Sequence, residues 1–499
     1  MKQTPRAYQL AIYHSILEKG NTLVVLPTGM GKTLIALMLI DKFRGRGRCL
    51  FLTPTKPLAK QHYESIKEII EVEDKDIELM TGDKPADKRK ELYKKNIIVA
   101  TPQTIANDIE NGIAPRDFVL CIFDECHRAV GDYAYVKIAA ALPNALIVGM
   151  TASPGGKKER ITEVLENLKI KNVEIRTSQD PDVSPYIKKS TIKWIGVDLS
   201  PTLREIKNEL DTLVKKYSQE LAALGFPPPL KHKGQFMLLG EKIRNIPTGK
   251  KYPAMVKYYA LMNVLHLTEL LETQGLHAMR TYLEKVDTKE SKSAKMLLKT
   301  PEIAEIKKIV YGTEEEHPKL KKLVELVKEL RGKKIIVFAQ YRDQIKKIED
   351  ELKKNGIAAK QFVGRKDGVT RKQQEETIAE FRDDKFSVLV ASSIGEEGLD
   401  IPKVDAVIFY EPIPSEIRSI QRRGRAARLK EGEVYILMTR GTRDEYYYWA
   451  SINREKKMKQ ILYAIQAKQQ RDGNVKKIEK KDENVNIRKI GQTKISHFF

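Results

Sequence analysis

Seven residues near the N-terminus have the types and spacing that could bind a chain of phosphates. They close an apolar run that begins at residue 21, open a helical pattern, and read Pro27-Thr28-Gly29-Met30-Gly31-Lys32-Thr33. Glycine lets the backbone approach phosphates closely, and the amide groups at the start of a helix point at them. We expect Lys32 to reach the β- and γ-phosphates of ATP, and Thr33 to hold Mg²⁺. A glycine-rich turn without a ligand is the alternative, but it does not explain strand, loop and helix in this order.

Two adjacent carboxylates could complete this chemistry. Asp124 and Glu125 close the apolar run FVLCIFD (118–124), and open α/β sheets bind ligands at such strand ends. We expect Asp124 to hold Mg²⁺, usually through water, and Glu125 to polarise the attacking water. A pair of acidic residues alone would be weak support, since most such pairs are solvated helix starts. His127 is expected to link this site to Thr151 and Ser153, because a single histidine is a poor metal site.

An arginine-rich segment far along the chain could act on the same phosphates. It reads Gln421-Arg422-Arg423-Gly424-Arg425-Ala426-Ala427-Arg428. Arg425 and Arg428 are three residues apart and would share one face of a helix. They could enter an ATP site from outside as arginine fingers that stabilise charge on the γ-phosphate. The alternative is the start of a basic helix that binds nucleic acid.

The elements that must position these residues form two similar regions. Short apolar runs of the kind found in strands buried on both faces alternate with helical stretches, with spacing that suits βαβ units. The runs lie at 21–27, 48–53, 96–101, 118–124 and 145–150, and again at 334–339, 360–364, 386–392, 405–410 and 433–438. We therefore predict an α/β protein with two doubly wound parallel-sheet domains, at 1–185 and 316–460. A helical insert is predicted at 200–315, and a basic flexible tail at 461–499.

Charge and cysteine content narrow the class of protein. The 499 residues carry 90 Lys and Arg against 67 Asp and Glu, a formal net charge of +23. A polyanionic partner explains that sign, because basic surfaces gain affinity by releasing counterions from phosphates. A charge-rich thermophile surface is the alternative, but it explains the amount of charge and not its sign.

The three cysteines, Cys49, Cys121 and Cys126, fit neither a disulfide framework nor a zinc finger, and we expect them to be reduced and mostly buried. With no signal peptide and no membrane span, we expect a soluble, cytoplasmic protein.

The predicted insert contains a basic segment. Residues 226–260 carry seven Lys or Arg and one acidic residue, Glu241. These side chains offer charge without base-reading geometry, which suits contacts to a duplex backbone near a junction. A solvated helix face is the open alternative. The candidate contacts are Lys231, Lys233, Lys242, Arg244, Lys250 and Lys251.

Taken in order, these motifs resemble those of superfamily 2 DNA or RNA helicases, and the resemblance covers residues 6–428. Leu26 replaces the first glycine of the full P-loop pattern, and the shorter form PTGxGKT is the one this superfamily uses. The resemblance implies RecA-like domains, with Arg6 and Gln9 reading adenine, Thr151 and Ser153 coupling the site, and Gln421 joining the catalytic set. Gly398 and Asp400 are then expected at the nucleotide. The implied nucleic-acid contacts are Thr53, Pro54, Thr55, Gly82, Thr101, Gln103 and Ser392.

Asp124-Glu125-Cys126-His127, the arginine segment and the helical insert resemble one branch of that superfamily. It contains the Fanconi anaemia M translocases, the RIG-I-like and Dicer helicases, and archaeal Hef, whose helicase half is the closest match. This resemblance implies an archaeal, ATP- and Mg²⁺-dependent helicase or translocase that acts on forked or branched DNA, both duplex and single-stranded, in fork repair or restart, with 3′→5′ polarity. A double-stranded RNA-dependent ATPase is the alternative. Hef couples its motor to a nuclease whose signature is absent here, so a nuclease domain or subunit is a further expected partner.

The last eight residues match a box that binds sliding clamps. Gln492 would be held by hydrogen bonds, while Ile495, Phe498 and Phe499 would enter an apolar pocket. Exposed apolar groups on a polar, basic tail usually indicate a partner. The alternative is an apolar ending without function.

Overall fold

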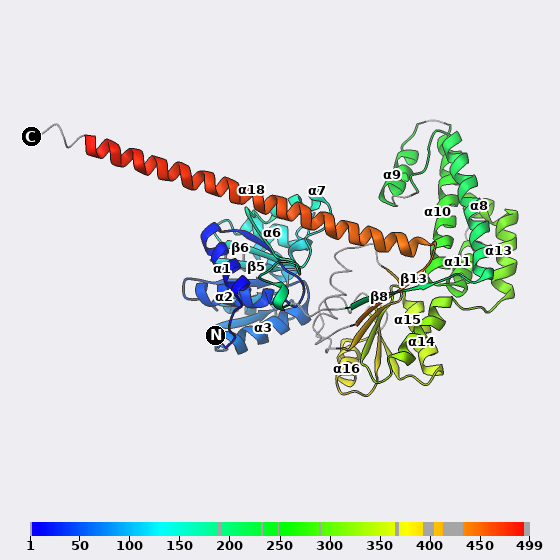
Figure 1. Cartoon of the computed structure of the whole chain (residues 1–499), viewed down its shortest axis with the longest axis horizontal. Helices are drawn as coiled ribbons and strands as arrows, with labels where there is room; N and C mark the ends of the chain where they lie inside the picture. The colour runs from blue at the N-terminus through cyan, green and yellow to red at the C-terminus, as the bar shows by residue number, and fades with distance from the viewer. Residues whose placement is uncertain are drawn as a thin grey trace, which may run out of the picture.

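The computed structural model describes residues 2–186, 191–230, 233–247, 249–288, 291–364, 369–392, 404–412 and 433–493, without the side chains of 233, 371, 470 and 472–493. Figure 1 shows two α/β lobes, a helical domain attached to the second lobe, and a long helix, α18, that runs from the second lobe across the first. This arrangement confirms the predicted fold class of two parallel-sheet domains with a helical insert.

The first lobe is built on a parallel sheet of seven strands in the order β3-β4-β2-β5-β6-β1-β7. Adjacent residues of one strand enter different cores, since Leu23 and Val25 pack on one face and Val24 on the other. Burial of both faces explains why these strands are apolar without alternation. The strands are β1 (Thr22–Val25), β2 (Cys49–Leu52), β3 (Ile77–Met80), β4 (Ile97–Ala100), β5 (Leu120–Asp124), β6 (Leu146–Thr151) and β7 (Asn172–Ile175).

Helices cover both faces of this sheet. Side chains of α1 (Ala7–Lys19), α2 (Lys32–Phe43) and α3 (Lys56–Ile70) pack into one core. Side chains of α5 (Pro102–Glu110), α6 (Ala134–Ala141) and α7 (Lys158–Asn167) pack into the other. The remaining elements of the lobe are α4 (Ala86–Leu92) and the short 3₁₀ turns η1 (Cys126–Arg128) and η2 (Ser184–Tyr186).

The second lobe has a six-stranded parallel sheet in the order β10-β11-β9-β12-β13-β8. Its edge strand, β8, comes from the segment just before the insert, and Thr191 pairs with Glu433 of β13. No strand was predicted in that segment. The strands are β8 (Thr191–Val197), β9 (Ile335–Phe338), β10 (Ala359–Phe362), β11 (Val388–Ala391), β12 (Ala406–Phe409) and β13 (Glu433–Thr439). Side chains of α14 (Pro318–Glu329) and α15 (Arg342–Lys354) cover one face, and α16 (Arg371–Arg382) covers the other.

The insert between the lobes is helical, as the sequence predicts, and has a core of its own. Leu203, Ile206, Leu210, Leu213, Tyr217 and Leu221 are buried along α8 at intervals of three or four residues. This spacing places one apolar stripe against the neighbouring helices. The helices are α8 (Pro201–Ala223), α9 (Lys233–Arg244), α10 (Lys251–Thr273), α11 (Leu276–Asp287), α12 (Lys292–Leu298) and α13 (Pro301–Gly312).

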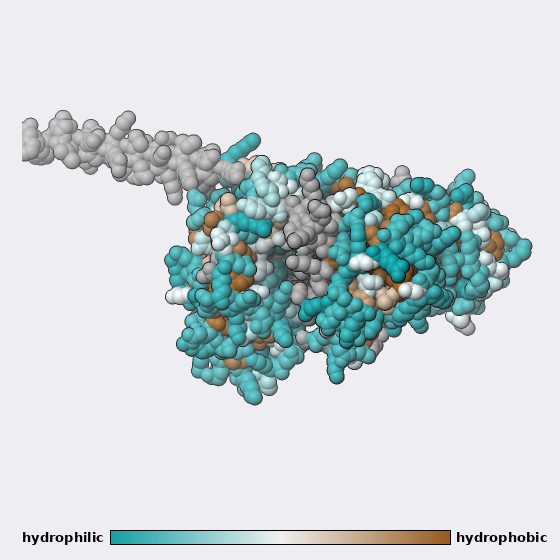
Figure 2. Space-filling view, turned by 60° about the horizontal axis from the view of Figure 1, so that its bottom comes forward, coloured by the Kyte–Doolittle hydropathy of each residue, from teal (hydrophilic) through white to brown (hydrophobic). Residues whose placement is uncertain are grey.

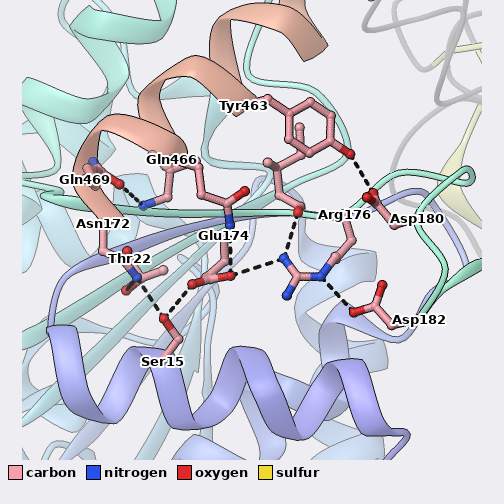
Figure 3. Close-up of polar contacts among 12 residues, drawn as sticks. Ser15, Thr22, Asn172, Glu174, Arg176, Asp180, Asp182, Tyr463, Gln466 and Gln469 are labelled. Atoms are coloured by element: carbon pink, nitrogen blue, oxygen red, sulfur yellow. Dashed lines mark hydrogen bonds and ion pairs between the residues drawn. The ribbon is translucent and has the colours of Figure 1, made fainter. Parts of the chain in front are cut away.

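The helix α18 (Arg443–Thr493) corrects the prediction of a flexible tail from residue 461. Met458 and Leu462 are buried in a core of the first lobe. Tyr463 donates to Asp180 Oδ2 at 2.6 Å, and the amide of Val173, on edge strand β7, donates to Gln469 Oε1 at 2.9 Å (Figure 3). The prediction failed because most of these contact side chains are polar, and their partners lie almost 300 residues earlier in the chain.

The surface and the cysteines agree with the composition. In Figure 2 the visible surface is mostly hydrophilic, with hydrophobic residues in scattered areas. The three cysteines are free and buried, as predicted. Among the helices of the described ranges, none has a stretch that is apolar and long enough to cross a membrane.

Candidate ATP and nucleic-acid site

The strand register of the first lobe brings its motifs to one edge of the sheet. Val25 pairs with Thr151, and Asp124 pairs with Met150 of the same strand. On the other side, Leu52 pairs with both Phe123 and Ala100. All strands are parallel, so each candidate loop begins at the same carboxyl edge. The phosphate loop, the acidic pair and the candidate backbone contacts therefore lie side by side, although the sequence separates them by up to about a hundred residues.

The phosphate loop has the backbone shape that its glycines allow. Gly29 and Gly31 have φ values of 83° and 73°, in the left-handed region that glycine adopts without strain. Gly31 is also the N-cap of α2, so the helix start faces the loop. Lys32 Nζ donates to the carbonyl oxygen of Leu26 at 2.9 Å, which keeps the ammonium group inside the loop. A phosphate would exchange this bond for a charge-assisted one.

The predicted adenine-reading residues pack against this loop. Gln9 Oε1 accepts from the amide of Arg6 at 2.8 Å, and Gln9 Nε2 lies 3.3 Å from the carbonyl oxygens of Met30 and Gly31. Tyr8, which the sequence did not single out, donates to Met30 O at 2.7 Å. The start of α1 is thus fixed to the phosphate loop by two side chains.

Asp124 is held by residues that the motifs did not include. Its Oδ2 accepts from His62 Nε2 at 3.2 Å, because a carboxylate can only accept. Tyr135 donates to the carbonyl oxygen of Asp124 at 2.7 Å, and burial raises the pKa of Tyr135 well above its ordinary value, so the hydroxyl stays protonated. The only sequence signal for His62 was its position a few residues after the candidate nucleic-acid contacts Thr53, Pro54 and Thr55.

The oxygen donors fit Mg²⁺. This hard cation prefers oxygen ligands and commonly uses one carboxylate together with the phosphates of its substrate. Thr33 supplies a hydroxyl at the start of α2, and Asp124 a carboxylate that is only partly accessible, with 12% of its side chain exposed. Among the described residues, no group of three or more His, Cys, Asp or Glu could hold a metal by itself. If the predicted ion binds here, Thr33 and Asp124 would supply its protein oxygen ligands and the nucleotide its phosphate ligands.

Glu125, His127 and Thr151 form the contact that the sequence predicts for His127. His127 Nδ1 lies 3.1 Å from Thr151 Oγ1 and 3.3 Å from Glu125 Oε2. Glu125 has a φ of 49°, a strained value for a residue with a side chain, which turns the chain sharply after β5. Thr151 Oγ1 also lies 3.5 Å from Glu125 Oε2 and 3.1 Å from Ser153 O. Since the hydroxyl has one proton, it can donate to only one of these acceptors at a time.

Ser153 extends this network to α18. Its Oγ donates to Met458 Sδ at 3.0 Å, and both side chains are buried. The predicted coupling residue thus contacts a helix whose first turns belong to the second lobe. Nothing in the sequence indicated this contact.

A cavity of about 420 Å³ lies at the ends of the neighbouring strands. Four of the predicted nucleic-acid residues line it, together with four residues that were not named individually as contacts. Thr53 is fully buried beside it, and Thr55 caps α3 by accepting from the amide of Leu58 at 3.5 Å. The lining residues are Pro54, Lys56, Gly82, Arg89, Thr101, Gln103, Thr104 and Asn107.

The two cations that line the cavity are both paired with carboxylates, Lys56 with Asp83 and Arg89 with Asp108. Arg89 makes a two-pronged ion pair with the fully buried Asp108, at 2.8 and 2.6 Å, and Tyr93 donates to the same carboxylate at 2.8 Å. This ion pair ties α4 to α5, and the loop containing Gly82 precedes α4. The lining offers threonine hydroxyls and the side-chain amides of Gln103 and Asn107 to a phosphate backbone.

Other candidate residues are less closely placed. Four of the candidate basic residues are exposed on the insert: Lys242, Arg244, Lys250 and Lys251. They would be exposed if they bind a duplex backbone and also if they are only solvated, so their exposure does not decide between the two interpretations. Ser392 lies just after β11, and its amide donates to Phe362 O at 3.1 Å. The described residues do not include Gly398, Asp400, Gln421, Arg425, Arg428, Lys231, Ile495, Phe498 and Phe499, nor the side chains of Lys233 and Gln492.

Three family descriptions match consecutive parts of the chain. Residues 2–156 match "Type III restriction enzyme, res subunit", and residues 318–430 match "Helicase conserved C-terminal domain". Residues 202–317 match "Putative ATP-dependent RNA helicase, helical bundle". These ranges follow the first lobe, the second lobe and the insert.

Individual relatives cover almost the whole chain. The crystal structure of the Hef helicase domain from Pyrococcus furiosus is 40% identical, with a TM-score of 0.70 over 90% of this chain and 98% of that one. A putative ATP-dependent RNA helicase of Methanocaldococcus jannaschii is 39% identical over 92% of this chain and 60% of its own length. An ATP-dependent DNA helicase of Pyricularia oryzae is 35% identical over 91% of this chain and 45% of its own length. The chain therefore spans about half the length of these two relatives.

Proposed function

The chain belongs to the superfamily 2 helicases, and from that membership we propose that it is an ATP-dependent DNA helicase or translocase that acts on forked or branched DNA. The observation that carries the proposal is the shared carboxyl edge of the first sheet. There the phosphate loop and the Asp124–Glu125 pair lie beside a cavity lined by candidate nucleic-acid residues. Hydrolysis and nucleic-acid binding can influence each other at such an edge, since the same short loops serve both.

Each residue near the phosphates has a role in this proposal. Lys32 binds the β- and γ-phosphates, while Thr33 and Asp124 hold Mg²⁺. Glu125 orients and deprotonates the attacking water, and its contacts with His127 and Thr151 fix the carboxylate. Mg²⁺ supplies charge neutralisation on the phosphates. The coupling residues Thr151 and Ser153 then link the γ-phosphate to α18.

The second lobe completes the site in the proposed cycle. ATP closes the lobes, so that Gln421, Arg425 and Arg428 reach the phosphates held by Lys32, with Gly398 and Asp400 near the nucleotide. Hydrolysis reopens them, and nucleic acid held by both lobes moves by one step. Family membership supports these roles, because the motif residues occur in the family's order.

DNA with a fork is the proposed substrate, with 3′→5′ movement. Among the relatives, the protein from Pyricularia oryzae is named a DNA helicase, and the protein from Methanocaldococcus jannaschii is named a putative RNA helicase. The basic insert, with exposed Lys242, Arg244, Lys250 and Lys251, supports a backbone contact beyond the two lobes. A double-stranded RNA-dependent ATPase is the second candidate, because an RNA helicase name is also present among the matches.

Two further partners are part of the proposal. The box formed by Gln492, Ile495, Phe498 and Phe499 binds a sliding clamp, with few anchors and an affinity on the order of micromolar. A nuclease domain or subunit acts with the motor. Calorimetry of a 484–499 peptide against the clamp, with both phenylalanines replaced by alanine as control, tests the first. Absence of heat at high micromolar peptide would reject it.

One assay tests the central function. ATP hydrolysis is measured with forked DNA, single-stranded DNA, duplex DNA and duplex RNA at equal nucleotide concentration. We expect the largest stimulation with forked DNA. Stimulation by duplex RNA alone would favour the second candidate, and no stimulation by any nucleic acid would contradict both.

Two variants connect that assay to the site. Lys32→Ala should lower hydrolysis on the order of 100-fold or more, because the phosphates lose their cation. DNA binding should largely survive, since dispersed phosphate contacts supply most of it. Glu125→Gln should bind ATP and Mg²⁺ but not turn over. Lys42→Ala, an exposed lysine at the end of the same helix as Lys32, is the matched control and should behave as wild type.

A further inference from the structure

The side chain of Arg6 is held by an aromatic ring that no motif predicted. The Arg6 guanidinium carbon lies 4.5 Å from the centre of the Tyr186 ring. Arg6 Nη1 also donates to Tyr8 Oη at 3.3 Å, and Tyr8 in turn donates to Met30 O of the phosphate loop. The rings of Tyr8 and Tyr186 are 5.8 Å apart. Arg6 thus lies against two tyrosines, one of which comes from a segment 180 residues later.

The turn that carries Tyr186 is built into the lobe. Val183 is fully buried in the same core as Tyr8 and Met30. The amide of Tyr186 donates to Val183 O at 2.9 Å, and the amide of Val183 donates to Asp180 O at 3.0 Å. The position of the Tyr186 ring is therefore set by a packed turn, although the residue as a whole is 42% exposed.

Polar contacts brace the same turn from the rest of the lobe and from α18. Arg176 Nε donates to Asp182 at 2.9 Å, and Tyr463 of α18 donates to Asp180 at 2.6 Å (Figure 3). Asp180 also accepts from the hydroxyl of Thr177 at 2.9 Å. The three contacts fix both acidic residues of the turn.

We propose that Tyr186 is a positioning residue for nucleobase binding. Its ring covers one face of the Arg6 guanidinium, so that the opposite face is presented flat to the base of the nucleotide. A planar guanidinium can stack on an aromatic ring on each of its two faces. An arginine held in one rotamer also loses less conformational entropy on binding than a free one. The proposal rests on the proposed ATPase function and adds a third element to the base site.

This placement makes the nucleobase site depend on the connection between the lobes. Residues 177–186 lead from the last strand of the first sheet toward β8, which belongs to the second sheet. The same segment contacts α18 through Thr177 and Asp180. A base stacked on Arg6 would therefore influence, through the Arg6–Tyr186 contact, the position of the segment that joins the lobes.

The test compares Tyr186→Leu with Tyr186→Phe, which keeps the ring. Affinity is measured for ATP, ADP and inorganic tripolyphosphate by titration calorimetry, together with KM and kcat for ATP. Tyr186→Leu should weaken the binding of ATP and ADP on the order of 3- to 30-fold, which is the effect expected from the loss of one stacked cation–ring contact. Tripolyphosphate affinity and kcat should stay unchanged, because the phosphate loop is not touched. Tyr186→Phe should match wild type.

A double variant tests whether Tyr186 acts through Arg6. Arg6→Leu/Tyr186→Leu should bind ADP no more weakly than Arg6→Leu alone. Tyr311→Leu removes a similar ring contact to Arg280, at 5.9 Å in the insert, and should leave all affinities unchanged. Equal ADP affinity of wild type and Tyr186→Leu would overturn the proposal. A loss of tripolyphosphate affinity in Tyr186→Leu as large as the loss of ADP affinity would also overturn it. A wild-type protein that binds no ATP would instead defeat the proposed function.

Discussion

The helix α18 is fixed at its two ends by different chemistry. Its first turn enters the second-lobe anchor, a buried cluster of Glu272, His317, Lys319 and Asp444. Farther along, the helix reaches the first-lobe docking site, where Met458, Leu462, Tyr463, Gln466 and Gln469 contact the first lobe. The anchor contains a buried ion pair, Lys319–Asp444, packed beside the neutral His317. The docking site consists of apolar side chains and of hydrogen bonds at a strand edge.

The anchor joins three segments that the sequence separates. Lys319 Nζ lies 2.6 Å from Asp444 Oδ2, and both side chains are 0% exposed. Thr439 donates its amide to the same Asp444 oxygen at 2.9 Å. His317 Nε2 donates to Glu272 O, in the insert helix α10, at 3.0 Å. Insert, second lobe and helix start are therefore held as one unit.

The difference indicates which end opens at lower cost. Opening the anchor breaks up a packed cluster, and wherever one charge left while the other stayed in the interior, the remaining charge would be buried without a partner, at a cost of about 3–5 kcal/mol. Separating the docking site exposes two apolar side chains and returns the polar groups to water. Relative movement of the lobes should therefore disturb the docking site and leave the anchor intact.

The largest effect is expected at the anchor. Asp444→Asn should lower the free energy of unfolding by about 3–5 kcal/mol, because Lys319 stays buried without its counter-charge. Denaturant unfolding of the full chain measures this. Asp198→Asn is the isosteric control: it removes a 3.0 Å ion pair with Arg440, but both side chains are about 60% exposed. It should cost under about 1 kcal/mol. Similar losses of stability in both variants would contradict the idea that breaking the buried ion pair costs more than breaking an exposed one.

An intermediate effect is expected from pH. Burial lowers the pKa of His317 to about 3, whereas an unfolded histidine titrates at about 6.5. Between these values the unfolded chain binds one more proton, so stability is complete above about 6.5 and falls as pH drops toward 3. The contribution is about 1.4 kcal/mol per pH unit. Unfolding measured from pH 7 to 5 should show a smaller slope in His317→Asn, and an unchanged slope would contradict this account.

The smallest effect is expected at the docking site. Tyr463→Phe removes the hydrogen bonds to Asp180 and Thr177 and should cost about 1 kcal/mol of docking. Hydrogen exchange at the Val173 amide, which donates to Gln469, should become about fivefold faster. Tyr446→Phe, a half-exposed tyrosine earlier in the same helix, is the control. If the Val173 amide exchanged at the wild-type rate in Tyr463→Phe, the docking site would not depend on this contact.

The sequence by itself determined the local units of this protein. Strands buried on both faces must be apolar along their length, so runs such as 21–27 and 118–124 predicted the sheets. The phosphate loop needs glycine, lysine and threonine in a fixed order, and in the structure Gly29 and Gly31 have the positive φ that glycine adopts without strain. Asp124 and Glu125 were found because a strand end places carboxylates at a ligand edge.

Only the tertiary structure decided the contacts between distant segments. β8 joins the second sheet, Tyr186 covers Arg6, His62 holds Asp124, and the helix start pairs Asp444 with Lys319. Tyr463 and Gln469 looked solvated because hydrophobic periodicity registers apolar burial and not hydrogen bonds to a strand edge. Each of these contacts depends on where the chain returns after many residues, and a local pattern carries no information on that return.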